Sequence, residues 1–203
     1  MTNARHPNLG RLRGYIQAMT RLADRNPDEA TWLREGEALL ASLIGHDDWL
    51  PEALAEPGPT YRQYLLHCDP LERFCVVSFV WGIGQRTPIH NHKTWGLVGM
   101  LRGAETSTTM HPVPGQPMRA GQVDHLHPGE VVGVGSGEED VHWVENALKD
   151  RPSISIHVYG GNIGAIERHV FDPQTSARKR FVSGYTNAVV PNLWDRAAEM
   201  VPA

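Results

Sequence analysis

The sequence lacks several features that would point to whole classes of protein. It has only two cysteines among 203 residues, no long apolar run and no excess of positive charge. A bilayer-spanning helix needs about 20 consecutive apolar residues, so we expect no membrane partner. The 19 Lys and Arg are scattered and the formal net charge is −4, which argues against a nucleic-acid partner.

The cysteines and the first residues bear on the cellular compartment. Cys68 and Cys75 flank a predicted turn and could pair, but two thiols in such a chain are more typical of reduced core residues. The first 14 residues carry three arginines and no apolar segment of a secretion signal. We therefore expect a cytoplasmic protein, while its oligomeric state stays undetermined.

The first quarter of the chain has a helical pattern. Asn26 is interpreted as a helix cap, followed by Pro27 in the first turn. Apolar residues then recur at helical spacing up to about Gly45, and residues 12–22 have a similar pattern. Residues 1–50 are therefore predicted to form a helical segment that packs on the rest of the chain.

From Tyr61 onward the pattern changes to short β-rich runs. The runs at 61–67 and 73–81 are joined by Cys68-Asp69-Pro70, which predicts a hairpin. Further apolar runs, separated by Gly, Pro and Asp, lie at 96–101, 130–134, 141–144, 154–159 and 166–171. Many short strands after two helices predict a mainly β fold, a sandwich or barrel, over residues 51–203.

Three of the eleven histidines stand in a pattern suited to a metal. His90 and His92 are separated by one residue, and His142 follows in a later apolar run. Residues i and i+2 of a strand point to the same face, so His90 and His92 are expected to face one interior. Imidazole suits Fe, Zn, Cu and Ni. The alternative is a pair of solvated histidines on a wet strand.

Glycine spacing around these histidines strengthens the metal interpretation. Gly84 precedes the His-Asn-His segment, Gly96 and Gly103 follow it, and Asn146 stands four positions after His142. Both elements resemble the two motifs of cupins, which implies a jelly-roll-like β-barrel. Most metal cupins have a Glu where this chain has Gly96. The resemblance therefore implies a three-histidine site with open coordination positions, suited to one Fe(II) per chain and an anionic thiolate.

Three polar residues share one face of a predicted strand. Ser155, His157 and Tyr159 alternate with apolar residues. They resemble the Ser-His-Tyr relay of the cysteine dioxygenase family, in which the Tyr hydroxyl points at the iron site. In that relay His157 would orient the hydroxyl and Ser155 would fix the imidazole tautomer. Alone, Tyr159 would be interpreted as a barrel-lining aromatic residue.

The wider sequence resembles the bacterial 3-mercaptopropionate dioxygenases, which belong to the same group. The likeness extends from Tyr61 to Asn187 and covers about two-thirds of the chain. Gln63 stands where the animal cysteine dioxygenases use an Arg for the substrate carboxylate. Arg168 corresponds to the residue that the bacterial branch uses instead, and an Arg fork matches a carboxylate. The alternative for Arg168 is a surface ion pair with Glu167 or a neighbouring acid.

Some details depart from the family pattern. The family usually has His-Asp-His-Thr, whereas this chain has Asn91 and Lys93 at the second and fourth positions. Both are expected to point away from the metal. The animal enzymes link a cysteine to the site tyrosine. Gly96 stands near that cysteine position, so Tyr159 is expected to be unmodified.

Four further residues near these motifs are assigned structural or solvated roles. Trp95 and Trp143 are close in sequence to the predicted ligands and are expected to pack and dry the cavity. His125 and His127 form a second His-x-His in a loop flanked by Gly and Pro, and we expect them to be solvated.

The resemblance implies a non-heme Fe(II) thiol dioxygenase that converts 3-mercaptopropionate and O2 to the sulfinate. The nearest alternative keeps this chemistry with L-cysteine as the substrate. A Zn- or Mn-dependent cupin isomerase or hydrolase is a second alternative. A non-catalytic cupin that binds a small acid is the third.

Overall fold

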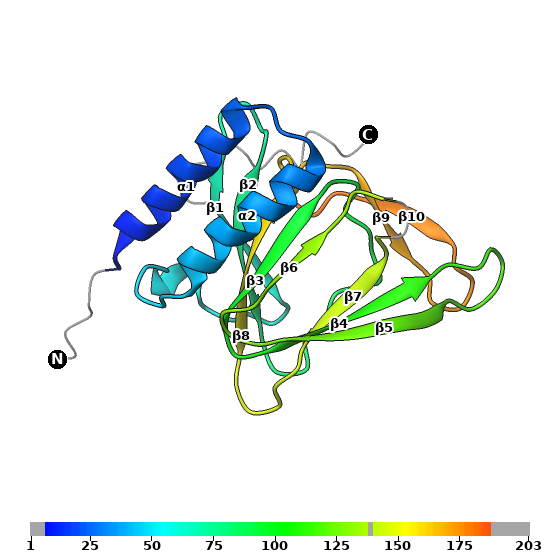
Figure 1. Ribbon diagram of the computed structural model, residues 1–203. Helices are drawn as coiled ribbons and strands as arrows, with labels where there is room; N and C mark the ends of the chain where they lie inside the picture. Colours follow the sequence, from blue (N-terminus) through cyan, green and yellow to red (C-terminus); the bar gives the residue numbers. More distant parts are fainter. Residues whose placement is uncertain (1–6, 138–139, 188–203) are drawn as a thin grey trace.

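Two helices form the first part of the computed structural model, which describes residues 7–137 and 140–187 (Figure 1). They are α1 (Leu9–Asp24) and α2 (Glu29–Ile44). The cap of α2 is Asp28, whose side chain accepts a hydrogen bond from the Thr31 N–H at 2.8 Å. The predicted cap at Asn26 is wrong, because Asn26 has φ +47° and lies in the turn between the helices.

The remaining described residues form a short 3-10 helix, η1 (Glu52–Leu54), and a series of strands. The strands are β1 (Arg62–Cys68), β2 (Cys75–Trp81), β3 (Gly96–Arg102), β4 (Glu105–His111), β5 (Arg119–Leu126), β6 (Val131–Val134), β7 (His142–Asn146), β8 (Ser153–Tyr159), β9 (Arg168–Phe171) and β10 (Arg178–Phe181). Strands β4, β5 and β10 were not predicted, because their residues are mostly polar and lack an apolar run.

The strands form two facing sheets and a small third one. The larger sheet has the order β1-β2-β8-β3-β6, the smaller has β5-β4-β7, and β9 pairs with β10. The predicted β1–β2 hairpin is confirmed, with Cys68 opposite Cys75, and both thiols are free and buried. Strands that are distant in sequence lie next to each other in the larger sheet, where β8 pairs with both β2 and β3. This arrangement is the double-stranded β-helix of cupins, and the predicted mainly β fold after N-terminal helices is confirmed.

Helix α2 lies along the outer face of the larger sheet, against β3 and β6, and α1 packs on α2 (Figure 1). Apolar residues from both layers form one core beneath the helices. Trp95 belongs to this core and stacks on Trp32 of α2 with ring centroids 4.7 Å apart. Trp95 therefore packs as expected, but against a helix rather than around the histidines.

The predicted division of the chain places its boundary after residue 50, between α2 and η1. The unit predicted for residues 51–203 extends into 188–203, which lies outside the described residues, so the boundaries stay a prediction. Among the described helices, none has the length and apolar character needed to cross a membrane.

Candidate metal centre

Three histidine rings meet inside the barrel. The ring centroids of His90, His92 and His142 lie 4.9 to 5.0 Å apart. One nitrogen of each ring lies within 4.8 Å of the others. His142 begins β7, but His90 forms only isolated bridges to His142 and Val170, and His92 belongs to no strand. The predicted strand for His90 and His92 is therefore wrong, although both rings reach the same point.

Hydrogen bonds set the orientation of the first two rings. His90 Nδ1 lies 3.0 Å from the Pro88 carbonyl oxygen, which can only accept. His92 Nδ1 lies 2.8 Å from the Asp140 carboxylate, which also accepts the His92 backbone N–H at 2.9 Å. Each Nδ1 therefore carries the hydrogen, so the lone pair of Nε2 is free for a metal.

His142 supplies the observation that tests whether a metal fits. Its Nδ1 lies 3.0 Å from Ser107 Oγ, which can accept a hydrogen, while its Nε2 is buried with no hydrogen-bond partner. A buried polar atom without a partner is costly unless something binds it. Burial lowers the pKa of His90, His92 and His142. The rings are therefore neutral at neutral pH, the form that binds metals.

Within the described residues, the three histidines are the cluster that could hold a metal ion, and no carboxylate belongs to it. This agrees with the absence of an acidic residue at Gly96. The donor set suits several divalent metals, among them Fe(II) and Zn(II). It does not by itself select one.

Asp140 contacts one of the three histidines and was not predicted from the sequence. The Asp140 carboxyl group lies 2.8 Å from His92 Nδ1 and so orients the His92 ring. Burial raises the pKa of Asp140 to about 7. Metal-bound histidines commonly donate their second N–H to a carboxylate. The position of Asp140, two residues before His142, is a signal that could have identified it.

Ser155, His157 and Tyr159 lie on one face of β8, as predicted. Ser155 Oγ lies 2.8 Å from His157 Nε2, and His157 Nδ1 lies 2.8 Å from the Tyr159 hydroxyl. The Tyr159 ring reaches the histidine cluster, and its centroid lies 5.3 Å from that of His92. Burial raises the pKa of Tyr159, so its hydroxyl stays protonated at neutral pH.

Gly96 lies directly opposite Tyr159 in the β3–β8 pairing. A Cβ atom at Gly96 would lie 3.2 Å from Tyr159 Cδ1. The backbone of position 96 therefore borders the Tyr159 ring, and glycine offers no sulfur to it.

A cavity of about 510 Å³ lies on one side of the cluster and is lined by His90, Tyr159, Arg168 and Gln63, among others. The Arg168 side chain is buried, with 4% of its surface exposed. Its Nη2 donates to Ser183 Oγ at 2.7 Å, and its Nε has no partner.

The alternative for Arg168, an ion pair with Glu167, is not observed. Glu167 instead lies 3.5 Å from Arg180, and Arg168 forms no ion pair within residues 7–137 and 140–187. The Arg168 guanidinium packs over the Phe181 ring, 4.6 Å from its centroid. Among the residues that the structure describes, this buried cation that faces a cavity therefore has no acidic partner.

Gln63 has a largely structural set of contacts. Its Nε2 donates to Ser183 Oγ at 3.2 Å and to the Gly184 carbonyl oxygen at 3.0 Å. Its backbone N–H donates to Thr186 Oγ1 at 2.9 Å. Gln63 lines the cavity as predicted, but its amide hydrogens hold the segment 183–184 that covers Arg168.

Asn91 and Lys93, the two departures from the family pattern, point away from the cluster. Asn91 Oδ1 accepts the His169 N–H at 2.9 Å, and Lys93 is exposed with φ +58°. His125 and His127 are exposed, as expected. However, His125 lies on β5 rather than in a loop, 3.2 Å from Thr106 Oγ1.

Trp143 packs at the surface of the smaller sheet rather than inside the cavity. Arg86 lies over its ring at 5.3 Å from the centroid, and it borders a small apolar cluster. It is packed as expected, but it does not line either cavity beside the histidines.

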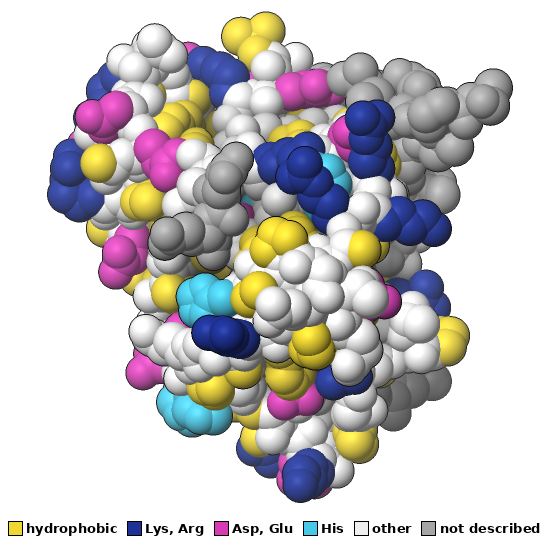
Figure 2. Space-filling model, turned by 90° about the vertical axis from the view of Figure 1, so that its right-hand side faces the viewer, with side chains coloured by type: hydrophobic (Ala, Val, Ile, Leu, Met, Phe, Trp, Pro, Cys, Tyr) yellow, Lys and Arg dark blue, Asp and Glu magenta, His cyan; other side chains and the backbone are white. Residues whose placement is uncertain are grey.

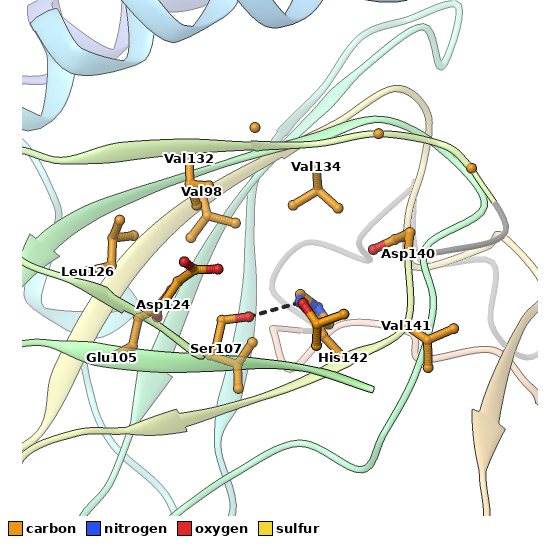
Figure 3. A pocket seen from close by; sticks show the side chains of 15 residues that line it. Val98, Glu105, Ser107, Asp124, Leu126, Val132, Val134, Asp140, Val141 and His142 are labelled. Carbon is orange, nitrogen blue, oxygen red and sulfur yellow. Dashed lines mark hydrogen bonds between the residues drawn. The ribbon is translucent and has the colours of Figure 1, made fainter. Parts of the chain in front are cut away.

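A second cavity, of about 350 Å³, lies on the other side of the cluster. Figure 3 shows Asp140 and His142 toward one end of it and Glu105 and Asp124 toward the other, with the Ser107–His142 hydrogen bond between. No residue lines both cavities. The cluster therefore separates a cavity with a buried cation from a cavity with carboxyl groups.

Comparisons with known proteins add the following likenesses. No protein-family model matches the chain. A conserved protein with a double-stranded β-helix domain from Klebsiella pneumoniae is 15% identical, covers 66% of this chain and 97% of its own, and has a TM-score of 0.45. TT1209 from Thermus thermophilus is 19% identical, with coverages of 54% and 92% and a TM-score of 0.43. A Cupin 2 conserved barrel domain protein from Salinispora arenicola is 18% identical, with coverages of 56% and 87% and a TM-score of 0.41.

Proposed function

We propose that this chain is a non-heme Fe(II) thiol dioxygenase that converts 3-mercaptopropionate and O2 to the corresponding sulfinate. One observation carries the proposal. A single cavity brings together a ring of the histidine cluster, the Tyr159 hydroxyl group and the guanidinium of Arg168, which has no acidic partner in the described chain. A small thiol acid has a thiol at one end, which a metal on the histidines would bind, and a carboxylate at the other, which the guanidinium would bind.

Arg168 binds the carboxylate of the substrate. A buried charge without a counter-ion is destabilising, so an anionic ligand is favoured at this position. The guanidinium stays charged even though burial lowers its pKa. Its unpartnered Nε and the planar fork suit a carboxylate, while Phe181 and Ser183 hold it in place.

His90, His92 and His142 hold the metal. A ferrous ion bound there would supply the redox chemistry that activates O2 and a Lewis-acid position for the thiolate sulfur. In the overall reaction the S–H bond is replaced by two S–O bonds, both oxygen atoms come from O2, and one proton is released from the thiol. Tyr159 donates a hydrogen bond toward the reacting end of the substrate, and His157 holds its hydroxyl in position.

The surface near β9 and β10 favours the approach of an anion. Burial lowers the pKa of His169 most, the nearby cations Lys93, Arg178 and Arg180 lower it further, and the Glu167 carboxylate acts against them. Lys and Arg side chains gather on part of the face drawn in Figure 2. Such a positive surface raises the encounter rate of an anionic substrate.

The experiment is O2 uptake by iron-loaded protein with a panel of thiols, with the product identified as a sulfinate. We expect turnover of 3-mercaptopropionate, and at least about tenfold lower kcat/KM for cysteamine, which lacks the carboxylate that Arg168 binds. L-cysteine in the same panel decides between the two thiol acids. Absence of thiol-dependent O2 uptake by protein that retains iron would refute the proposal and would favour a binding cupin.

A further inference from the structure

Glu105 is a buried carboxyl group that the proposed reaction does not use. It begins β4, and only 3% of its surface is exposed. Its Oε2 has no hydrogen-bond partner among the described residues, and the ion pairs found within 7–137 and 140–187 do not include Glu105. A buried polar atom without a partner is costly, so a ligand that donates to this carboxyl group is favoured.

The Glu105 side chain faces the second cavity, the one of about 350 Å³. Alternate residues of a strand point to one face, and Glu105, Ser107 and Thr109 of β4 all line this cavity. Glu105 and Asp124 lie toward the end remote from Asp140 (Figure 3). The volume is near the lower end of the range for small-molecule sites, so the cavity suits a small ligand.

The charge of the lining residues favours a cation. Glu105, Asp124 and Asp140 line the cavity, and no Lys or Arg is among the described residues that line it. Asp140 contacts His92, so Glu105 and Asp124 give the other end its negative character. A surface of one sign attracts a ligand of the opposite sign. An amine is also far more basic than a carboxylate, so it takes up the proton of a neutral carboxyl group and becomes the cation.

A metal ion does not fit this end of the cavity. A divalent ion needs several ligand groups close together. In the part of the chain that the structure describes, the cluster able to hold a metal is that of the three histidines, and neither Glu105 nor Asp124 belongs to it. An organic cation needs one carboxyl group and an apolar wall for its carbon chain.

Apolar side chains supply such a wall and leave it accessible. The apolar lining residues are Val98, Leu126, Val132, Val134, Val141 and Val144. Val132 is 40% exposed although it lines the cavity, and Asp124 is exposed as well, so a ligand can reach the cavity from solvent. Burial of a short alkyl chain against this wall should raise affinity about fourfold per methylene.

We propose that this cavity is a second binding site, for a small primary alkylamine whose ammonium group is held by Glu105 and whose carbon chain packs on the valines. It lies on the other side of the histidine cluster from the cavity with Arg168, and no described residue lines both. The two cavities therefore suit ligands of opposite charge. Binding in the second cavity does not depend on the proposed reaction.

The first test is a titration of the full-length protein, loaded with diamagnetic Zn(II), with n-butylamine at pH 7 and detection by methyl NMR. We expect saturable shifts of the methyl groups of Val98 and Val134, which line the second cavity. The methyl groups of Val170, which lines the cavity with Arg168, should not shift.

The same titration with other small molecules separates the head group from the chain. 1-Butanol and pentanoate carry the same alkyl chain without the positive charge, and each should bind at least about tenfold more weakly. Ethylamine keeps the charge and lacks two methylenes, so it should bind about fifteenfold more weakly than n-butylamine.

The second test compares two variants that each lose one negative charge. Glu105→Gln keeps the size of the side chain and should weaken n-butylamine binding by about tenfold or more, because a hydrogen bond between charged groups is lost. Glu37→Gln, at an exposed position of α2, is the matched control and should bind like the unmodified chain.

Four results would overturn the inference: no saturable binding of n-butylamine, equal affinity for the three head groups, shifts at Val170 in place of Val98, or unchanged affinity in Glu105→Gln. The head-group comparison uses the unmodified chain, so it decides the question even if Glu105→Gln does not fold. Both tests use a redox-inert metal, so their outcome is independent of O2 uptake.

Discussion

The two faces of β8 differ in their surroundings. One face packs in the hydrophobic core, and the other lies beside the candidate metal centre. Ile154, Ile156 and Val158 point outward into the core beneath the helices. The residues that alternate with them, Ser155, His157 and Tyr159, point inward, and His157 lies within hydrogen-bond distance of the other two. Residues only one position apart thus lie in surroundings of opposite chemistry, as the alternation of a strand requires.

Burial has a different effect on each face of β8: it stabilises the fold on the outward face and fixes polar groups on the inward face. Both faces are buried along the whole strand. Burial of apolar surface on the outward face stabilises the folded state by about 25 cal/mol per Å². On the inward face the polar groups are paired with one another, which holds them in one arrangement. Substitutions on the two faces should therefore separate stability from function.

The largest effect is expected for His142→Ala, on the inner side of the barrel. The variant should lose stoichiometric metal and lower turnover by about a thousandfold or more, because a divalent site with two imidazoles left is much weaker. Metal analysis by mass spectrometry and O2 uptake measure the result. His125→Ala, an exposed histidine on β5, is the matched control and should bind metal normally. Retention of metal by His142→Ala would contradict the assigned cluster.

The opposite face is tested by Ile156→Ala. Ile156 is fully buried in the core, so the free energy of unfolding should fall by about 2 to 5 kcal/mol. Chemical denaturation measures this change. Metal content and turnover per folded molecule should be unchanged, because Ile156 does not line the cavity with Arg168. A large drop in turnover of the folded variant would show that the two faces are coupled.

Much of this division could be predicted from the sequence. The alternation in residues 155–159 predicted the two faces of β8, and the His-x-His with a later His predicted the histidine cluster. Fold class followed from the many short apolar runs. The polar strands β4 and β5 escaped prediction, because their residues lack an apolar run and their pairing depends on distant neighbours.

Residues that act through the three-dimensional arrangement were also missed. Asp140 became visible only when the start of β7 was placed beside the loop that carries His92. The cap of α2 was misplaced from Asp28 to Asn26, since both residue types favour that position. Local patterns therefore predicted elements and ligands, whereas the partners of those ligands needed the tertiary structure.

A smaller effect is expected for Arg168→Lys, which keeps the charge and removes the fork. The KM for 3-mercaptopropionate should rise about tenfold, because one ammonium cannot replace two parallel N–H donors. Steady-state O2 uptake measures KM and kcat, and the thermal midpoint should change little. Arg180→Lys, an exposed position on β10, is the matched control. An unchanged KM in Arg168→Lys would remove Arg168 from substrate binding.

The smallest effect should come from the helix that covers the outward face. Asp28→Ala removes the cap of α2, and the free energy of unfolding should fall by about 1 kcal/mol. Asn26→Gly is the control and should change stability by less than about 0.5 kcal/mol, because glycine readily adopts the positive φ of this position. Neither substitution should alter metal content or turnover. If Asp28→Ala lowered metal binding at a temperature where the protein is folded, the outward face would not be independent of the site, and the separation drawn along β8 would fail.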